Sequence, residues 1–279
     1  MEHHVNHSLH YGSGVFEWIR FYPTSQWVKI FRLKEHIERL FYSAKTMHLD
    51  FDYSIEAIIE ACKDTVKKSG VESWYIRLMV YHDTWSMKLS AKNNINVTIS
   101  VWKRWKYLSD DEVHVKISDF RRISPQTADM NAKVCGYYAS NILASFGVKG
   151  EWYDEALLLD IDEFIAEWPW ENIFFIKDDK VYTPQVWSIL PWITRDTIIQ
   201  LLDDQFNIKV IAKNIIPDDI LDFDEAFFVW TAAEVTLIGS IVLQDGTRKD
   251  FQNRFSKEIK KIYQQIVSGE IQNYLKRCW

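Results

Sequence analysis

The sequence predicts an α+β protein of two domains, and three observations support this. Residues 1–102 combine strand-like runs with amphipathic helices, and residues 113–279 alternate short strands with helices. Between them, residues 103–112 are charged and show little apolar pattern. A chain of 279 residues is long enough for two domains of ordinary size. We therefore expect a small N-terminal α/β domain, a connecting loop at 103–112 and a larger C-terminal domain.

Two helices are predicted in the first domain. Residues 35–49 carry apolar side chains at helical spacing on one face. Residues 54–69 repeat that pattern, with Ser54 as a plausible N-cap and Gly70 just beyond the end. β-branched and aromatic residues predict the strands of this domain, at 74–81 and 96–102.

The second domain should begin with a strand and end with an amphipathic helix. Asp178 and Asp179 suggest a tight turn between two of its strands, and Thr194 is a plausible helix cap. In chain order the predicted elements are strand 113–118, helix 136–146, strands 155–160, 164–167, 172–177 and 181–183, helix 194–206, strands 208–212 and 225–229, and helix 253–268.

Composition excludes several classes of function. A net charge of -6 offers no electrostatic case for nucleic-acid binding. The apolar runs are too short to span a bilayer, and the polar, His-rich N-terminus lacks the apolar core of a signal peptide. Three widely spaced cysteines form neither a metal-ligand pattern nor a disulfide framework. We expect a cytoplasmic protein without a metal.

Three features by themselves suggest small-molecule chemistry. Lys133 has mostly small or apolar neighbours, and burial would favour its neutral, nucleophilic amine, although an isolated lysine is usually a surface residue. Residues 191–196 form a loop entering a helix, whose N–H groups suit a phosphate or simply a cap at Thr194. Arg39 lies in an amphipathic helix, where a solvated position is the ordinary interpretation.

Eight short motifs occur in one order along nearly the whole chain. They are His7–Glu17, Arg32–Leu40 with Ser43–Lys45, Tyr75–Arg77, Asn131–Tyr138, Tyr153–Asp160, Ala166-Glu167 with Glu171–Phe174, Leu190-Pro191 with Ile193–Asp196, and Thr231–Thr236. With these motifs the chain resembles the branched-chain aminotransferases, which belong to the fold-type IV enzymes dependent on pyridoxal 5'-phosphate (PLP). The resemblance implies that the larger domain is β-barrel-like.

The resemblance also implies roles for individual residues. Lys133 would bind the cofactor and move the proton at the substrate Cα. Glu167 would face the pyridine nitrogen and keep it protonated, and Tyr138 would hydrogen-bond the ring hydroxyl. The remaining cofactor residues would be Arg39, Leu190, Ile193, Thr194 and Thr231, chiefly around the phosphate. The substrate side would be lined by Tyr11, Phe16, Arg20, Tyr75, Arg77 and Ala232.

The implied reaction is amino-group transfer between leucine, isoleucine or valine and 2-oxoglutarate. A D-amino acid aminotransferase or an aminodeoxychorismate lyase of the same fold is the first alternative, against which the Tyr75–Arg77 and Thr231–Thr236 motifs argue. The second alternative is a non-catalytic protein with a blocked pocket. The resemblance further implies small-molecule amino acid and 2-oxo acid partners and a homodimer or higher homo-oligomer.

Tryptophan stands where the resemblance implies glycine. The chain has 13 tryptophans and 9 glycines, whereas average usage would give about 20 glycines. The positions are Trp18, Trp27, Trp74, Trp85, Trp105, Trp152, Trp168, Trp170, Trp187, Trp192 and Trp230. An aromatic-rich core or substrate pocket would not select glycine positions. We therefore hypothesise a decoding difference: UGA is tryptophan in some genetic codes and glycine in at least one bacterial code.

A second departure is at the N-terminus. The resemblance implies a further strand of the small domain before the His7–Glu17 motif. We expect that the start codon has been placed too late, and that a chain without this strand would be less stable.

Overall fold

The computed structural model describes residues 5–24, 28–71, 73–102, 112–167, 171–232 and 234–271. The chain divides into two compact units, one of residues 1–105, 131–138 and 267–279, the other of residues 106–130 and 139–266. This division differs from the predicted boundaries, because residues 131–138 group with the first unit, to whose sheet they are hydrogen-bonded. The predicted connecting loop, apart from Glu112, lies outside the described residues.

An antiparallel sheet is the centre of the first unit. Its strands are β1 (Val15–Pro23), β2 (Val28–Ile30), β3 (Trp74–His82) and β4 (Ile95–Trp102), in the order β2-β1-β3-β4. Side chains alternate between its faces, and one set, which includes Val15, Ile19, Ile76 and Leu78, is buried in the core. The opposite set of β1 and β3 includes most of the predicted substrate residues.

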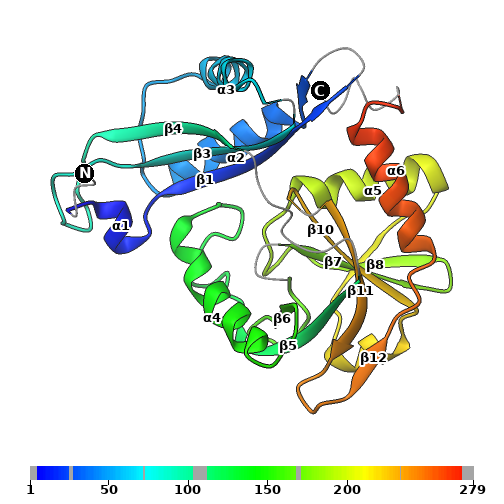
Figure 1. Ribbon diagram of the computed structural model, residues 1–279. Coiled ribbons are helices and arrows are strands. Elements are labelled where there is room, and N and C mark those ends of the chain that lie inside the picture. The colour runs from blue at the N-terminus through cyan, green and yellow to red at the C-terminus, as the bar shows by residue number, and fades with distance from the viewer. Residues whose placement is uncertain are drawn as a thin grey trace. The chain divides into compact units, whose positions relative to one another are not determined.

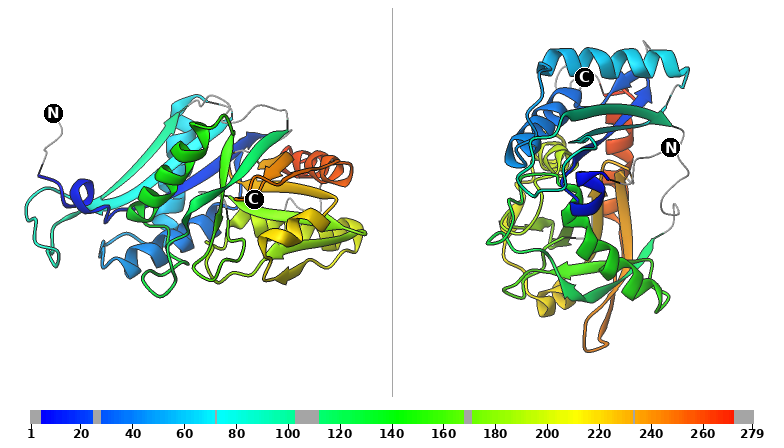
Figure 2. Two further views of the ribbon diagram at one scale, coloured as in Figure 1. Left: turned by 90° about the horizontal axis from the view of Figure 1, so that it is seen from below. Right: turned by 90° about the vertical axis from the view of Figure 1, so that its left-hand side faces the viewer.

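Two helices supply the rest of that core, α2 (Leu33–Thr46) and α3 (Ile55–Ser69). Figures 1 and 2 show both beside β1, β3 and β4. The predicted ends of α3 are confirmed: Ser54 Oγ accepts from Ala57 N at 3.1 Å, and Gly70 has a left-handed φ of 66°. A short helix α1 (His7–Tyr11) precedes β1. Neither α1, β1 nor β2 was predicted.

A curled mixed sheet is the centre of the second unit. Its main path runs β6-β5-β11-β10-β7-β8-β9, and β12 pairs with β11. The strands are β5 (Val113–Arg121), β6 (Glu155–Leu159), β7 (Asn172–Lys177), β8 (Lys180–Pro184), β9 (Ile211–Lys213), β10 (Glu225–Trp230), β11 (Glu234–Val242) and β12 (Arg248–Asp250). Strands β6, β7 and β10 are almost entirely buried on both faces. Their sequences are therefore mostly continuous runs of apolar residues and do not alternate between apolar and polar residues.

Three α-helices pack on this sheet: α4 (Tyr138–Lys149), α5 (Ile193–Phe206) and α6 (Phe255–Val267). α4 lies beside β6, where Ala144 and Val148 join one apolar cluster with Leu158 (Figure 1). A 3-10 helix at Cys135–Tyr137, in the first unit, leads directly into α4. Another, at Pro217–Asp222, precedes β10. Among the described residues, no helix has the length and apolar character needed to cross a membrane.

The predicted hairpin of β7 and β8 is confirmed, with Lys177 opposite Lys180 across Asp178 and Asp179. Another strand prediction for this domain is wrong. The predicted strand at 164–167 is reduced to one isolated bridge, Leu159 with Ile165, because the chain turns tightly at Glu163, whose φ is 65°. Strands β11 and β12 were not predicted.

Candidate active site

Lys133 is held beside the first strand of the sheet in the first unit. Its carbonyl accepts from Phe16 N at 3.2 Å, and Cys135 N donates to Gly14 O at 2.8 Å. On the other side, Lys133 N donates to Ser43 Oγ, on α2, at 2.8 Å. Long-range backbone pairing therefore fixes the position from which the lysine side chain extends.

A close approach of two glycines holds this segment in place. Gly136 N donates to Gly12 O at 2.8 Å. A Cβ on Gly12 would lie only 2.6 Å from Gly136 Cα, and the φ of Gly12 is 63°. Both the left-handed backbone and the contact require glycine at position 12. The motif residues Gly12 and Gly136 thus explain how two distant stretches of chain meet.

The Lys133 amine is buried among aromatic groups. The residue is 2 % exposed, and Nζ donates to Tyr138 Oη at 2.7 Å. Nζ also lies 4.7 Å from the centre of the Phe16 ring. An amine kept from bulk water beside a phenol hydroxyl is suited to nucleophilic chemistry at a carbonyl.

Four predicted substrate residues, Phe16, Arg20, Tyr75 and Arg77, gather on one face of the sheet. Trp18 is opposite Arg77, and Arg20 is opposite Tyr75, across β1 and β3. Phe16 and Trp18 lie under the same guanidinium, since Arg77 Cζ is 4.7 Å and 4.3 Å from their respective ring centres. The Phe16 ring also packs against Tyr138 at 5.1 Å. This face therefore combines apolar rings with fixed positive charge, next to the lysine.

Tyr11 has a different setting. It is 46 % exposed, its hydroxyl donates to Met87 O at 3.1 Å, and its ring packs against His7. Within the described residues these contacts place Tyr11 by the loop before β4, not with the group on the sheet face.

Arg39 is positioned by two residues that sequence reasoning missed. Its Nε and Nη2 donate to the two oxygens of Glu17, at 2.6 and 2.8 Å, and His36 Nδ1 lies 2.7 Å from the same carboxylate. Burial opposes ionisation of Glu17, but the Arg39 charge and these hydrogen bonds prevail and lower its pKa to about 2. Burial also lowers the pKa of His36, against the opposing effect of Glu17. The spacing of His36 and Arg39 on one helix face was the available signal.

In the second unit, Glu167 is a buried carboxylate. The residue is 0 % exposed, and Oε1 accepts from Arg122 Nε at 2.6 Å. Oε2 accepts from Asn172 Nδ2 at 3.3 Å and from the indole Nε1 of Trp192 at 3.0 Å. Arg122 and Asn172 were not predicted. A buried carboxylate requires such partners, but their positions cannot be read from sequence because they lie on different elements.

The predicted phosphate residues of this unit lie at the start of α5 and after β10. Thr194 does not cap α5: the helix begins at Ile193, Trp192 is the N-cap, and Thr194 lies in the first turn. Leu190, Ile193 and Thr194 are all buried. Thr231, also buried, and the half-buried Ala232 form the turn between β10 and β11. Backbone N–H groups of a helix start suit an anion.

The residues of this site do not fit PLP as they stand. The indole of Trp192 already donates to the carboxylate expected to meet the pyridine nitrogen. The indole of Trp18 lies beneath Arg77, in the middle of the predicted substrate face. Trp230, beside Thr231, is completely buried. The Trp192 indole therefore occupies the carboxylate that a ring nitrogen would need, and the Trp18 indole lies within the predicted substrate face.

Other tryptophans point outward. Trp152 is 96 % exposed with a φ of 71°, and Trp85 and Trp187 are also exposed. A left-handed backbone under an exposed indole is the geometry expected of a glycine. Four further predicted positions, Trp27, Trp105, Trp168 and Trp170, lie outside the described residues.

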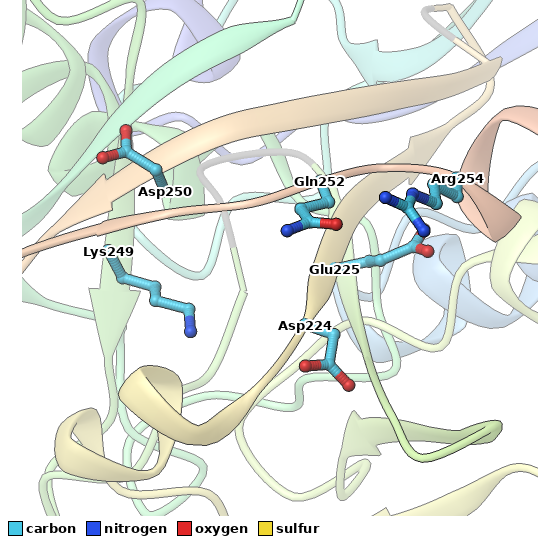
Figure 3. Close-up of a pocket in the computed structure, with 6 residues that line it drawn as sticks. All are labelled: Asp224, Glu225, Lys249, Asp250, Gln252 and Arg254. Atoms are coloured by element: carbon cyan, nitrogen blue, oxygen red, sulfur yellow. The ribbon is translucent and has the colours of Figure 1, made fainter.

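A pocket of about 310 Å³ lies elsewhere on the second unit (Figure 3). Its lining is charged and polar, and includes none of the predicted site residues. Glu225 there caps α6, since its carboxylate accepts from Phe255 N and Ser256 N at 2.9 and 2.8 Å. The lining residues are Asp224, Glu225, Lys249, Asp250, Gln252 and Arg254. The candidate site residues are therefore those around Lys133 in the first unit and those around Glu167 in the second.

Comparison with known proteins agrees with the fold and the motifs. The family model for amino-transferase class IV matches residues 14–241. The branched-chain-amino-acid aminotransferase of Pseudomonas aeruginosa is 38% identical over 96% of this chain and 88% of its own length.

Solved structures agree as well. The branched-chain aminotransferase of Thermoproteus uzoniensis with norvaline has a TM-score of 0.93 at 33% identity, covering 100% of this chain and 93% of that one. The branched-chain amino acid aminotransferase of Thermobaculum terrenum in its PLP form has a TM-score of 0.90 at 26% identity, with coverage of 100% and 92%. The predicted fold-type IV architecture is confirmed. This chain belongs to the class IV aminotransferase family.

Proposed function

We propose that the protein with glycine at positions 18, 168, 170, 192 and 230 transfers the amino group between branched-chain L-amino acids and 2-oxoglutarate, with PLP as cofactor. Enzymes of the class IV family depend on this cofactor, whose protonated ring serves as an electron sink. The observation that carries the proposal is the buried Lys133 amine on the Tyr138 hydroxyl, beside a sheet face with apolar rings and Arg77. The named relatives favour this reaction over the D-amino acid and lyase alternatives.

Each group of side chains has a role in this proposal. Lys133 would hold the cofactor and move the proton at the substrate Cα, and Tyr138 would orient the lysine amine. Arg77 and Tyr75 would hold the substrate carboxylate, with Arg20 as a further polar contact. Phe16 provides the apolar wall for an aliphatic side chain. The positive charge and apolar rings of this face support an aliphatic amino acid as substrate.

The second unit provides groups for the cofactor itself. Glu167, oriented by Arg122, would accept a hydrogen bond from the protonated ring nitrogen once position 192 is glycine. Leu190, Ile193, Thr194, Thr231 and Ala232 serve the phosphate and the substrate-side backbone, and Arg39 of the first unit adds charge for the phosphate. The buried ion pair of Glu167 supports this assignment, because a carboxylate held ionised favours a protonated ring nitrogen.

A substrate panel tests the proposal. The chain with glycine at positions 18, 168, 170, 192 and 230 should form glutamate from 2-oxoglutarate with L-leucine, L-isoleucine or L-valine. Lys133→Ala in that chain should lower kcat by at least about 10²-fold, because the general base is lost. Lys67→Ala, at an exposed lysine of α3, is the matched control and should have no effect. Activity with D-alanine but not with L-leucine would refute the assignment.

We also propose a homodimer or larger assembly in the cytoplasm. Leu9 and Leu89 are 70% and 79% exposed, at α1 and the loop before β4, which Tyr11 and Met87 join by a hydrogen bond. Burial of these two side chains against another copy would remove their apolar surface from water. Light scattering on the purified protein tests the assembly, and Leu9→Glu with Leu89→Glu should shift it toward monomer. A monomeric parent protein would refute this part.

A further inference from the structure

We infer that the Trp192 indole occupies the subsite of the cofactor ring, so that the chain with tryptophan at this position blocks its own active site. The inference rests on the proposed function, because that function assigns Glu167 to the cofactor. It adds that the blocking group is the Trp192 indole, whose Nε1–H donates to the Glu167 carboxylate.

The carboxylate of Glu167 is engaged on both oxygens. Arg122 donates to Oε1 at 2.6 Å, while Asn172 and Trp192 donate to Oε2 at 3.3 and 3.0 Å. Glu167 is 0 % and Trp192 2 % exposed, so neither group is reached by water. A ring N–H from a ligand would therefore have to replace the indole N–H, the donor among these three that belongs to a flat aromatic ring.

The indole also reveals what this subsite accepts. A planar ring with a single N–H donor is seated on a buried carboxylate, immediately before the first turn of α5 at Ile193. The indole N–H therefore takes the place that the N–H of a protonated cofactor ring would need on this carboxylate.

The backbone at position 192 does not require an indole. Trp192 is the N-cap of α5 with φ −72° and ψ 140°, and its side chain makes no capping hydrogen bond. Glycine is well tolerated at an N-cap. Trp192→Gly should therefore leave α5 intact while it vacates both the ring space and the Glu167 acceptor.

Cofactor binding tests the inference. The background is a chain with glycine at 18, 168, 170 and 230, in which Trp192 is retained or replaced by Trp192→Phe or Trp192→Gly. Each protein is titrated with PLP by absorbance, and the adduct at Lys133 is counted by mass after borohydride reduction. The Trp192→Gly variant should bind at least about tenfold more tightly than the protein that retains Trp192. The Trp192→Phe variant keeps the bulk without the N–H and should also bind more weakly than Trp192→Gly. Equal affinity with Trp192 and with Trp192→Gly would overturn the inference.

A second readout does not involve the cofactor. In the protein that retains Trp192, the indole N–H should exchange slowly with solvent and shift in its ¹⁵N resonance when Glu167→Gln weakens the charged hydrogen bond. An unchanged resonance would contradict the assigned contact. If the Trp192→Gly variant binds PLP more tightly than the protein that retains Trp192, and carries it on Lys133 but turns over no amino acid, the proposed substrate class fails and this inference stands. If no version carries PLP on Lys133, both fail.

Discussion

An exposed tryptophan in a left-handed turn provides the sharpest test of whether the chain is built for glycine. Trp152 follows α4, its N–H donates to Lys149 O at 3.1 Å, and its φ is 71°. The side chain is 96 % exposed, so replacing it forfeits almost no buried surface. We predict that Trp152→Gly stabilises the protein.

The magnitude follows from the backbone. A left-handed residue with a side chain costs about 1–2 kcal/mol, which glycine avoids. Glycine in turn adds about 0.4–1 kcal/mol of unfolded-state entropy. The net stabilisation should be roughly 0.5–1 kcal/mol. Trp152→Ala keeps the strained φ and should be within about 0.5 kcal/mol of the parent.

Urea unfolding of the parent, Trp152→Gly and Trp152→Ala measures the difference. Trp85→Gly is the matched control, because Trp85 is 89% exposed and has no positive φ. That change should destabilise by up to about 1 kcal/mol through unfolded-state entropy. If Trp152→Gly were no more stable than Trp152→Ala, the backbone argument for glycine would be refuted.

Three further predictions concern buried charge and the cofactor partner. The Glu17 pKa, lowered from 4.5 to about 2, corresponds to about 3 kcal/mol of stability. This stability is present above pH 4.5 and lost as the pH falls toward 2, so the deficit of Glu17→Gln in urea unfolding should shrink over that window; a constant deficit would contradict it. Burial and the nearby Glu155 charge raise the Glu171 pKa well above 4.5. Its stability contribution is therefore present below pH 4.5 and lost as pH rises, so Glu171→Gln should be more stable than the parent at pH 8 and lose that advantage at pH 4, which paired unfolding curves will check. In the glycine-substituted chain, Tyr138→Phe should shift the absorbance maximum of bound PLP, because a hydroxyl partner of the ring oxygen is lost; an unchanged spectrum would reject that role.

Some structural features could be predicted from the sequence because the residues that determine them are close together in the chain. Ser54 and Gly70 set the ends of α3, and the two aspartates between β7 and β8 set a hairpin. Both depend on hydrogen bonds between residues a few positions apart. The motif order predicted the family in the same way, since it needs no knowledge of which residues meet.

The partners of the site residues required the tertiary structure. Nothing local joins Lys133 to β1 or Arg122 to Glu167, since these contacts close long loops and depend on how strands pair. The sequence by itself determined the lysine and the carboxylate assigned to the cofactor and the tryptophans that stand at glycine positions. Only the tertiary structure showed that the Trp192 N–H donates to Glu167, because these residues lie on separate segments that folding brings together. It also showed the positive φ of Trp152, because that backbone angle depends on the turn that follows α4.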